Sequence, residues 1–485
     1  MNQKNRLRVA AFLVLLAVSL PAAAKKLAVP GLYYDTLDNG LQLFVMENHA
    51  APLAFVMLTV RTGAVSQTSE TAGLFHLYEH MMFKGNAKYP DQAATTAALN
   101  GMGVGDWNGF TSVDAVSYYF TVPADQVRGG LEFWSYAVRT PLMEAQEFAN
   151  EKEVVVSEIA ANETNPGRIF LAALNKHLFA ASPWRRDSSG TTAIVRGATV
   201  AQMRDIQRTY YVPNNAAVFV GGDVRHDDVL KMVWEIYGGW EKTDAVPFEQ
   251  PPTKTPFRQT RKFVYGDART GDRFVQVGYY LRGPDVATDA ADTYGADMWG
   301  QLLHKPDGAF KSLLLADETL SVPDPDYVGG YYATERASGM VSLSSVMLND
   351  GDAVQKAEHW LSLVQGQGGA LFKSDTFADE RLLREAKNQL DDADAYAVET
   401  AEGFLRALSS VWASGGLAYY LSYDKNMRNV TVADVRAFVE KYIEGKFGMF
   451  VVFVSPAVYE KYRAEFAAAG YETITADNAF WWKGE

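Results

Sequence analysis

Hydrophobic positions along the chain follow two alternating patterns. Short apolar runs rich in β-branched and aromatic residues, such as 216–221 and 273–281, predict buried strands. Longer stretches, such as 378–390, repeat apolar residues at three- and four-residue spacing and predict amphipathic helices. Strands that alternate with such helices predict an α+β fold, in which helices pack on a sheet.

Two segments of the chain resemble each other. Thr199 begins the run TVAQMRD, which leads to Tyr210 and then to an apolar run from Ala216. Thr431 begins TVADVRA, which leads to Tyr442 and the run MFVVFV. The offset, 431 − 199 = 232, carries the first tyrosine onto the second without a gap. Each copy has the pattern of an N-capped helix followed by a buried strand, which favours a duplicated domain over a chance similarity.

The length of the chain agrees with this duplication, because 485 residues exceed what one hydrophobic core usually holds. Residues 246–256 are rich in proline and predict an extended linker. We therefore predict two similar domains, residues 25–245 and 257–485, each with a mostly antiparallel sheet packed with helices.

The first 24 residues have the pattern of a secretory signal peptide. Lys4, Arg6 and Arg8 precede the apolar run 9–20, and small residues follow at 21–24. The apolar run is shorter than the ~20 residues that a membrane-spanning helix needs, which disfavours the alternative of an uncleaved anchor. We expect cleavage near Ala24 and export, into the periplasm if the source is Gram-negative.

Charge and composition limit the chemistry. The formal net charge of −13 argues against a nucleic-acid partner, because phosphate binding needs an excess of lysine and arginine. The chain has no cysteine, and so has neither disulfides nor thiolate metal ligands. A bound metal would therefore need histidine, aspartate or glutamate.

The segment His76-Leu-Tyr-Glu79-His80 has the spacing of a metal site. On a helix, residues four apart lie on one face, so both imidazoles can reach one ion. Glu79 is adjacent to that face, where its carboxylate can take a proton from metal-bound water. Two histidines with purely structural hydrogen bonds are the alternative. The remaining histidines have no ligand-like spacing, and we interpret them as structural or surface residues: His49, His177, His226, His304 and His359.

A third protein ligand is needed, and a predicted helix around 150–159 offers three candidates. Glu151 and Glu158 are seven residues apart, two helical turns, so their side chains share a face, whereas Glu153 points elsewhere. Composition and spacing leave the choice between Glu151 and Glu158 open, and solvated surface charges are the alternative for all three.

These residues give the chain a resemblance to the M16 (pitrilysin/insulinase) family of metallopeptidases, in the half-length branch of mitochondrial processing peptidase. The similarity extends over nearly all of the chain after residue 24 and is most specific at HLYEH, at NGFTS from Asn108, and at the glutamates. The family motif E-(x)6-E implies Glu158 as the third ligand of one Zn²⁺ per chain. It also implies Glu151 as a second carboxylate that orients the site.

The resemblance also implies a substrate strand. In the family, a peptide is added to a sheet edge that corresponds to residues 105–120 here, so main-chain hydrogen bonds supply much of the binding. It implies Asn108, Phe110 and Thr111 as peptide contacts. The sequence pattern alone indicates only a strand with aromatic residues.

One departure from the family bears on partners. Members that act unaided have an Arg and a Tyr seven residues apart in the second domain, where Leu315 and Val322 stand here; Tyr327, Tyr331 and Arg336 lie nearby. Half-length members pair into a clamshell around a chamber, and this chain would be one half of it. We therefore predict a heterodimer with a related subunit that lacks HxxEH, with a homodimer as the alternative.

The metal motif, together with this resemblance, implies a zinc-dependent endopeptidase that hydrolyses short or unfolded peptides in an enclosed chamber, with Glu79 activating a zinc-bound water. Two alternatives remain open at this point. One is a non-catalytic scaffold or assembly subunit of the same fold, and the other is a peptidase dedicated to processing one precursor.

Overall fold

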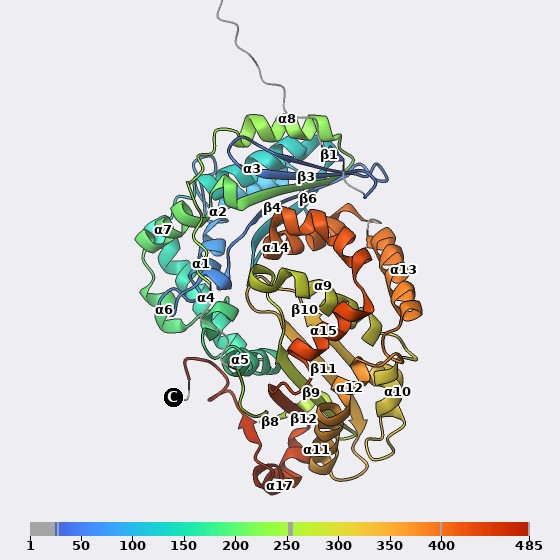
Figure 1. The fold of residues 1–485 in the computed structure, drawn as a ribbon. Helices are drawn as coiled ribbons and strands as arrows, with labels where there is room; N and C mark the ends of the chain where they lie inside the picture. Colours follow the sequence, from blue (N-terminus) through green and yellow to red (C-terminus); the bar gives the residue numbers. More distant parts are fainter. Residues whose placement is uncertain (1–24, 27–28, 251–255, 398–399, 484–485) are drawn as a thin grey trace, which may run out of the picture.

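The computed structural model describes residues 25–26, 29–250, 256–397 and 400–483, and in them the chain forms two α+β halves, each built on one sheet (Figure 1). The predicted signal peptide, residues 1–24, lies outside the described residues, as do residues 251–255 of the predicted linker.

The first sheet has seven strands in the order β1-β2-β3-β7-β4-β6-β5. Neighbouring strands are antiparallel except for β3 and β7, which are parallel. The central strand β7 is buried along its whole length, as its apolar sequence predicts. The strands are β1 (Lys25–Lys26), β2 (Leu32–Thr36), β3 (Gln42–Glu47), β4 (Leu53–Val60), β5 (Trp107–Thr111), β6 (Val116–Pro123) and β7 (Ala216–Gly222).

Helices α3 and α8 pack together on the outer face of this sheet, and α1 and α2 lie near its β5 edge (Figure 1). Buried leucine, valine and aromatic side chains fill the core between sheet and helices. The helices of this half are α1 (Leu74–Met81), α2 (Gln92–Gly101), α3 (Val127–Arg139), α4 (Ala145–Thr164), α5 (Pro166–Leu178), α6 (Thr192–Gly197), α7 (Val200–Tyr210) and α8 (His226–Tyr237).

The second sheet has six strands in the order β10-β11-β9-β12-β8-β13. The first three pairs are antiparallel, and β12–β8 and β8–β13 are parallel. The strands are β8 (Arg261–Gly266), β9 (Phe274–Arg282), β10 (Val328–Ala333), β11 (Met340–Leu348), β12 (Met449–Val454) and β13 (Glu472–Ile474).

A second core lies between this sheet and the helices of the second half. Trp299, Trp360 and Phe438 are among its largest buried side chains. The helices are α9 (Val286–Leu303), α10 (Ala309–Leu315), α11 (Ala353–Leu363), α12 (Gly369–Phe372), α13 (Glu380–Ala397), α14 (Ala401–Asn429), α15 (Val432–Tyr442), α16 (Pro456–Lys461) and α17 (Arg463–Ala468).

The two halves share one topology, which confirms the predicted duplicated α+β fold. The order β3-β7-β4-β6-β5 in the first sheet corresponds to β8-β12-β9-β11-β10 in the second, with the parallel pair at the same place. Helices α7 and α15 are 232 residues apart at both ends, and each begins with a capping box, on Thr199 and on Thr431. The domain boundaries given above stay predictions.

Each half also supplies a helix to the other half's sheet. Helix α14 packs on the inner face of the first sheet, where Trp412 contacts Phe219 with ring centroids 5.9 Å apart (Figure 1). Helix α5 packs on the second sheet, where Phe170 contacts Phe453 at 4.8 Å. Since each helix covers apolar strand residues of the other half, the two halves are joined by hydrophobic packing.

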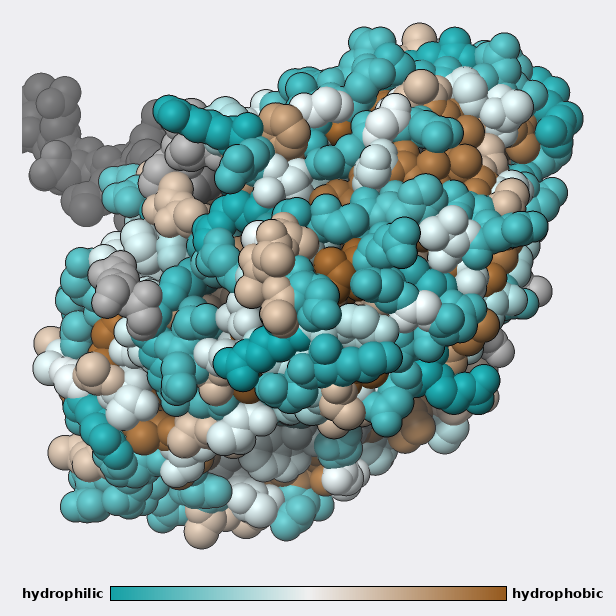
Figure 2. Space-filling view, turned by 90° about the horizontal axis from the view of Figure 1, so that it is seen from below, coloured by the Kyte–Doolittle hydropathy of each residue, from teal (hydrophilic) through white to brown (hydrophobic). Residues whose placement is uncertain are grey.

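None of the helices in the described residues is both long enough and apolar enough to cross a membrane. The face seen from below is mostly hydrophilic, with apolar residues interspersed among polar ones (Figure 2).

Candidate metal centre

Helix α1 carries both histidines of the HxxEH motif. It begins after Gly73, which has a φ of +89° and whose backbone N–H donates to the Gln67 side chain at 2.8 Å. A side chain at Gly73 would meet the carbonyl oxygen of Ser189 at 2.5 Å, so glycine is required there. Leucine, phenylalanine and methionine residues bury the other face of the helix, which leaves His76 and His80 on the partly open side.

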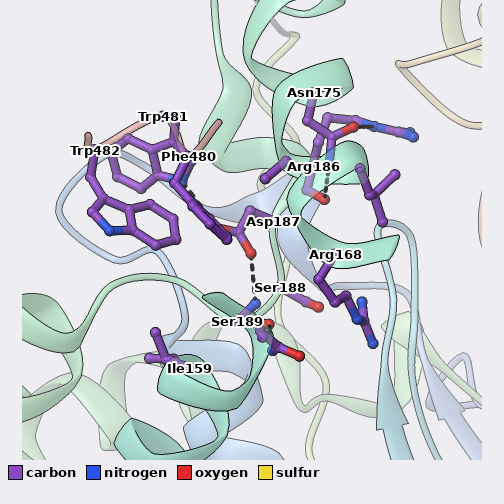
Figure 3. Close-up of a pocket in the computed structure, with 13 residues that line it drawn as sticks. Ile159, Arg168, Asn175, Arg186, Asp187, Ser188, Ser189, Phe480, Trp481 and Trp482 are labelled. Atoms are coloured by element: carbon purple, nitrogen blue, oxygen red, sulfur yellow. Dashed lines mark hydrogen bonds between the residues drawn. The ribbon is translucent and has the colours of Figure 1, made fainter. Parts of the chain in front are cut away.

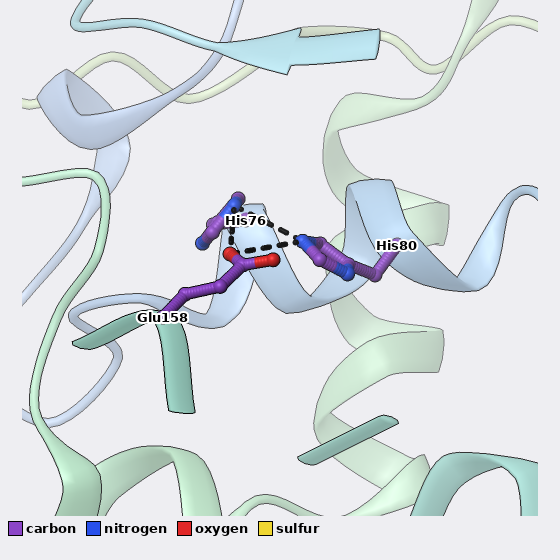
Figure 4. Close-up of side chains that lie close together, drawn as sticks. All are labelled: His76, His80 and Glu158. Atoms are coloured by element: carbon purple, nitrogen blue, oxygen red, sulfur yellow. Dashed lines mark hydrogen bonds and ion pairs between the residues drawn. The ribbon is translucent and has the colours of Figure 1, made fainter. Parts of the chain in front are cut away.

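Helix α4 brings Glu158 to the two histidines (Figure 4). The Nε2 atoms of His76 and His80 are 3.1 Å apart, and Glu158 Oε2 is 3.6 Å from each of them. The Glu158 side chain is 45% exposed, so its carboxylate lies at the open side of the group. The structure therefore brings together the three residues predicted as metal ligands, one oxygen and two nitrogens converging on one point.

These distances fit a tetrahedral ion. Ligand atoms about 2.0–2.1 Å from a zinc ion are about 3.3–3.4 Å from one another in a tetrahedral site. The three observed separations lie on either side of that value. Two imidazoles and a carboxylate are also a donor set that catalytic zinc sites use with a fourth, open position.

The two imidazoles differ in their affinity for protons. Burial and the neighbouring His80 charge lower the pKa of His76 to about 4. Burial also works against a charged His80, but Glu151, Glu158 and Glu79 outweigh it and raise the pKa of His80 to about 9. His80 is thus the imidazole that favours the charged form and His76 the one that favours the neutral form. Binding of a metal ion would release the extra proton of His80, because ligating imidazoles must be neutral.

Glu151 lies behind His80 rather than among the three converging atoms. Its Oε1 is 2.8 Å from His80 Nδ1, and its Oε2 is 2.7 Å from Lys84 Nζ. The carboxylate is buried, and although burial favours its neutral form, the hydrogen bonds from His80 and Lys84 lower its pKa. The hydrogen bond to Glu151 fixes the orientation of the His80 ring, whose Nε2 faces His76 and Glu158.

Glu79 lies next to the histidine face of α1 and its carboxylate contacts strand β5. Its Oε2 accepts a 2.7 Å hydrogen bond from the Thr111 hydroxyl, and a side chain at Gly109 would meet Oε1 at 2.9 Å. Burial raises the pKa of Glu79 to about 7, against the effects of the Thr111 hydrogen bond and the His80 charge. A carboxyl group with a pKa near neutrality can both accept and return a proton.

Strand β5 is the last strand of the first sheet, so its outer edge has no strand neighbour within the described part of the chain. Side chains alternate along it: Trp107 and Thr111 lie on the α1 side, where Trp107 packs on Phe83. Asn108 is exposed and bonds the N–H of Gly109, and Phe110 packs on Tyr119 on the opposite side. Of the three predicted peptide contacts, Thr111 thus faces Glu79, and Asn108 and Phe110 face away from it.

Leu315 and Val322 lie in the second half and supply no polar group. Val322 is buried in the second core, and Leu315 packs against that core at the end of α10. Of the polar residues nearby, Tyr327 stacks on Phe274, and the Arg336 guanidinium lies over Phe248.

The other five histidines lie in no such group within the described residues, and each has its own hydrogen-bonding partner. Their partners are Asp223 for His49, Arg261 for His177, Asp35 and Asp227 for His226, the Gly300 carbonyl for His304, and Asp317 for His359.

Two contacts of the centre were not predicted from the sequence. Lys84 lies just beyond the end of α1, four residues after His80, and its Nζ is 2.7 Å from Glu151 Oε2. No sequence pattern indicates the hydrogen bond between Thr111 and Glu79, because this bond depends on which face of β5 packs on α1.

Two protein-family models match successive parts of the chain. Residues 43–192 match the family described as insulinase (peptidase family M16), and residues 197–316 match the peptidase M16 inactive domain. The chain is 26% identical over 200 residues to the mitochondrial-processing peptidase subunit beta of Dictyostelium discoideum, which covers 41% of this chain. The matched region spans 42% of that relative and 39% of the corresponding Arabidopsis thaliana subunit.

Solved structures share the fold at low sequence identity. A protease from Helicobacter pylori superimposes with a TM-score of 0.71 at 16% identity, covering 88% of this chain and 100% of that one. The periplasmic protease PqqL from Escherichia coli superimposes with a TM-score of 0.70 at 19% identity, covering 92% of this chain and 51% of that one.

Proposed function

The chain belongs to the insulinase family of peptidases, family M16, and from that membership we propose that it is a zinc-dependent endopeptidase. The observation that supports the proposal most directly is the convergence of His76, His80 and Glu158, with Glu79 beside them on the strand side. We assign one Zn²⁺ per chain to the three ligands, and the role of general base to Glu79.

Zinc in this position would polarise the scissile carbonyl and lower the pKa of an attacking water. Glu79 takes the proton of that water and later gives it to the leaving amine, for which a pKa near 7 is suited. Thr111 holds the Glu79 carboxylate in place, and Glu151 holds His80. The two positioning hydrogen bonds are 2.7 Å and 2.8 Å long.

The open edge of β5 suits a peptide substrate. An extended peptide that adds to this edge bonds main chain to main chain, which makes binding tolerant of sequence. Gly109 and Thr111 of β5 both contact the Glu79 carboxylate. A peptide that pairs with β5 therefore passes close to the base. We propose Asn108 and Phe110 as side-chain contacts of that peptide, which would be short or unfolded, since only an extended chain fits an edge strand.

We further propose that the chain works with a second subunit. Leu315 and Val322 leave the second half without the polar pair that the sequence resemblance leads us to expect, and a related subunit without HxxEH would supply it. A homodimer is the fallback. The two chains would enclose a chamber as the halves of a clamshell.

The pattern of residues 1–24 supports export of the chain, and one structural relative is named as a periplasmic protease. We propose an exported peptidase, periplasmic if the source is Gram-negative.

Two other functions are compatible with this fold, and each can be distinguished from a general peptidase by experiment. A scaffold subunit would not need the intact ligand set, so the close approach of His76, His80 and Glu158 favours an enzyme. A dedicated processing peptidase would use the same chemistry but would spare unrelated unfolded peptides.

The test measures zinc content by mass spectrometry and peptide hydrolysis in parallel, on the wild type and on Glu79→Gln. We expect one zinc per chain in both proteins and hydrolysis in the wild type alone. A wild type that holds no zinc under metal-retaining conditions would leave the scaffold function. Zinc in both proteins with hydrolysis in neither would direct the search to a co-purifying subunit.

A further inference from the structure

A cavity of about 50 Å³ lies against Ile159, the residue that follows Glu158 on α4 (Figure 3). Its walls come from α4, α5, the segment 186–189 and the segment 480–482. On α4 it is lined by Ile159, which directly follows Glu158, and by Asn162, which lies one turn beyond Glu158 on the same face. The cavity therefore begins within one helical turn of a metal ligand. At roughly 10–15 Å³ for each water, it holds a few waters or a group of similar size.

Arg168 lines this cavity from the first turn of α5. The turn is fixed, because the Asn165 side chain caps the backbone N–H groups of Gly167 and Arg168. Within the described residues, the Arg168 guanidinium makes no hydrogen bond and no ion pair, and the residue is exposed.

The other charged groups of the cavity are already engaged. Arg186 pairs with Glu335 and donates to Ser338. Asp187 accepts from the Trp481 indole and from the Ser189 backbone N–H, so both of its oxygens are bonded. In Figure 3, Asp187 lies between Arg168 and the aromatic residues 480–482, which leaves the guanidinium on the far side of the cavity from them.

We propose that Arg168 is a specificity-determining residue that binds a carboxylate of the substrate close to the scissile bond. A guanidinium presents a planar fork of N–H donors that matches the two oxygens of a carboxylate. A guanidinium without a protein partner therefore favours a substrate that carries a negative charge near the reacting bond. The inference rests on the proposed peptidase function and names its substrate class: peptides with an aspartate or glutamate near the cleaved bond. Leu171, one turn further on α5 and 37% exposed, gives that side chain an apolar surface for its methylene groups.

The carboxylate has two possible sources, an acidic side chain or the α-carboxylate at the end of a short peptide, and the experiment separates them. Quenched fluorescent peptides carry glutamate, glutamine or lysine at one of the three positions on either side of the cleaved bond, each with a free or an amidated carboxyl end. For the zinc-loaded wild type we expect kcat/KM about tenfold higher for glutamate than for glutamine at one position. Dependence on the free carboxyl end alone would assign Arg168 to the α-carboxylate.

Variants test whether Arg168 carries the preference. In Arg168→Gln the ratio between the glutamate and glutamine peptides falls to about one, and in Arg168→Glu the lysine peptide becomes the best of the three. Arg225→Gln is the matched control, an exposed arginine at the start of α8 on the outer surface, and it keeps the wild-type ratio. Melting temperature and zinc content show that each variant is folded and loaded.

Binding gives a readout independent of turnover. With Glu79→Gln as the background, the dissociation constants of the glutamate and glutamine peptides should differ about tenfold, and adding Arg168→Gln should remove the difference. Equal rates and equal affinities at every position, or a preference that survives Arg168→Gln, would overturn the inference. A wild type that binds glutamate peptides selectively but hydrolyses none would instead contradict the proposed function.

Discussion

The Thr111 hydroxyl donates a 2.7 Å hydrogen bond to the Glu79 carboxylate, and this bond joins the edge strand to the proposed base. Glu79 is 6% exposed, so a carboxylate that lost this partner would find no water to replace it easily. Strand β5 therefore serves two purposes in the proposed mechanism, because its outer edge receives the peptide and its inner face orients Glu79.

Thr111→Val should lower kcat and leave the zinc content unchanged. Valine keeps the shape of threonine and removes the hydroxyl, and a hydrogen bond to a charged group is worth about 1.5–3 kcal/mol, which corresponds to about ten- to hundredfold in rate. Thr111→Ser, which retains the hydroxyl, should recover most of the activity. Steady-state kinetics with zinc analysis checks this, and an unchanged kcat in the valine variant would remove Thr111 from the mechanism.

The centre of the site was predictable because it depends on local spacing. Residues four apart on a helix share a face whatever the helix packs against, so His76 and His80 followed from the sequence alone. The choice of Glu158 over Glu151 needed the family resemblance. Spacing gave the two glutamates one face, and only the packing of α4 on α1 directs Glu158 to the Nε2 atoms and Glu151 to Nδ1 of His80.

The hydrophobic pattern of the sequence could not predict that each half contributes a helix to the sheet of the other half. An amphipathic pattern shows that a helix buries one face, but not which sheet receives it. Helix α14 belongs to the second half in sequence and nonetheless packs on Phe44 and Phe219 of the first. Arg168 is a similar case, because its place beside the metal centre follows from the turn between α4 and α5.

Lys84→Met should weaken zinc binding, by about ten- to hundredfold in dissociation constant. The Glu151 carboxylate is held by two partners, His80 on one oxygen and Lys84 on the other, with Lys84 Nζ 2.7 Å from Oε2. Without Lys84, the buried carboxylate keeps only its bond to His80. Competition with a zinc-binding dye measures the effect on the purified chain. Lys88→Met is the control, since Lys88 pairs with Glu132 at the surface; equal zinc affinity in the two variants would contradict the role of Lys84.

Asp297 should make the stability of the second half depend on pH. Burial raises its pKa to about 7, although Tyr423 and Thr334 donate hydrogen bonds to it. The unfolded chain releases this proton at an ordinary aspartate pKa near 4, so the folded state binds it more tightly. The associated stability is present in full below about pH 4 and is lost as the pH rises to about 7.

Asp297→Asn removes this titration. The melting temperature of the variant relative to the wild type should therefore rise between pH 4 and pH 7 and level off above that. Differential scanning calorimetry over this range checks the trend. Parallel curves for the two proteins would show that Asp297 titrates alike in the folded and unfolded chain.

The last prediction concerns the second subunit. Val322 is buried in the second core and Leu315 packs against it, so neither can reach a peptide on β5 without unfolding that core. The isolated, zinc-loaded chain should therefore hydrolyse peptides slowly. Addition of a co-purifying related subunit should raise kcat/KM and give a complex of twice the mass in sedimentation velocity. If the chain instead pairs with itself, its specific activity should rise with its own concentration. A monomer that reaches the full rate of the complex with no second polypeptide present would show that this chain contains a complete peptidase.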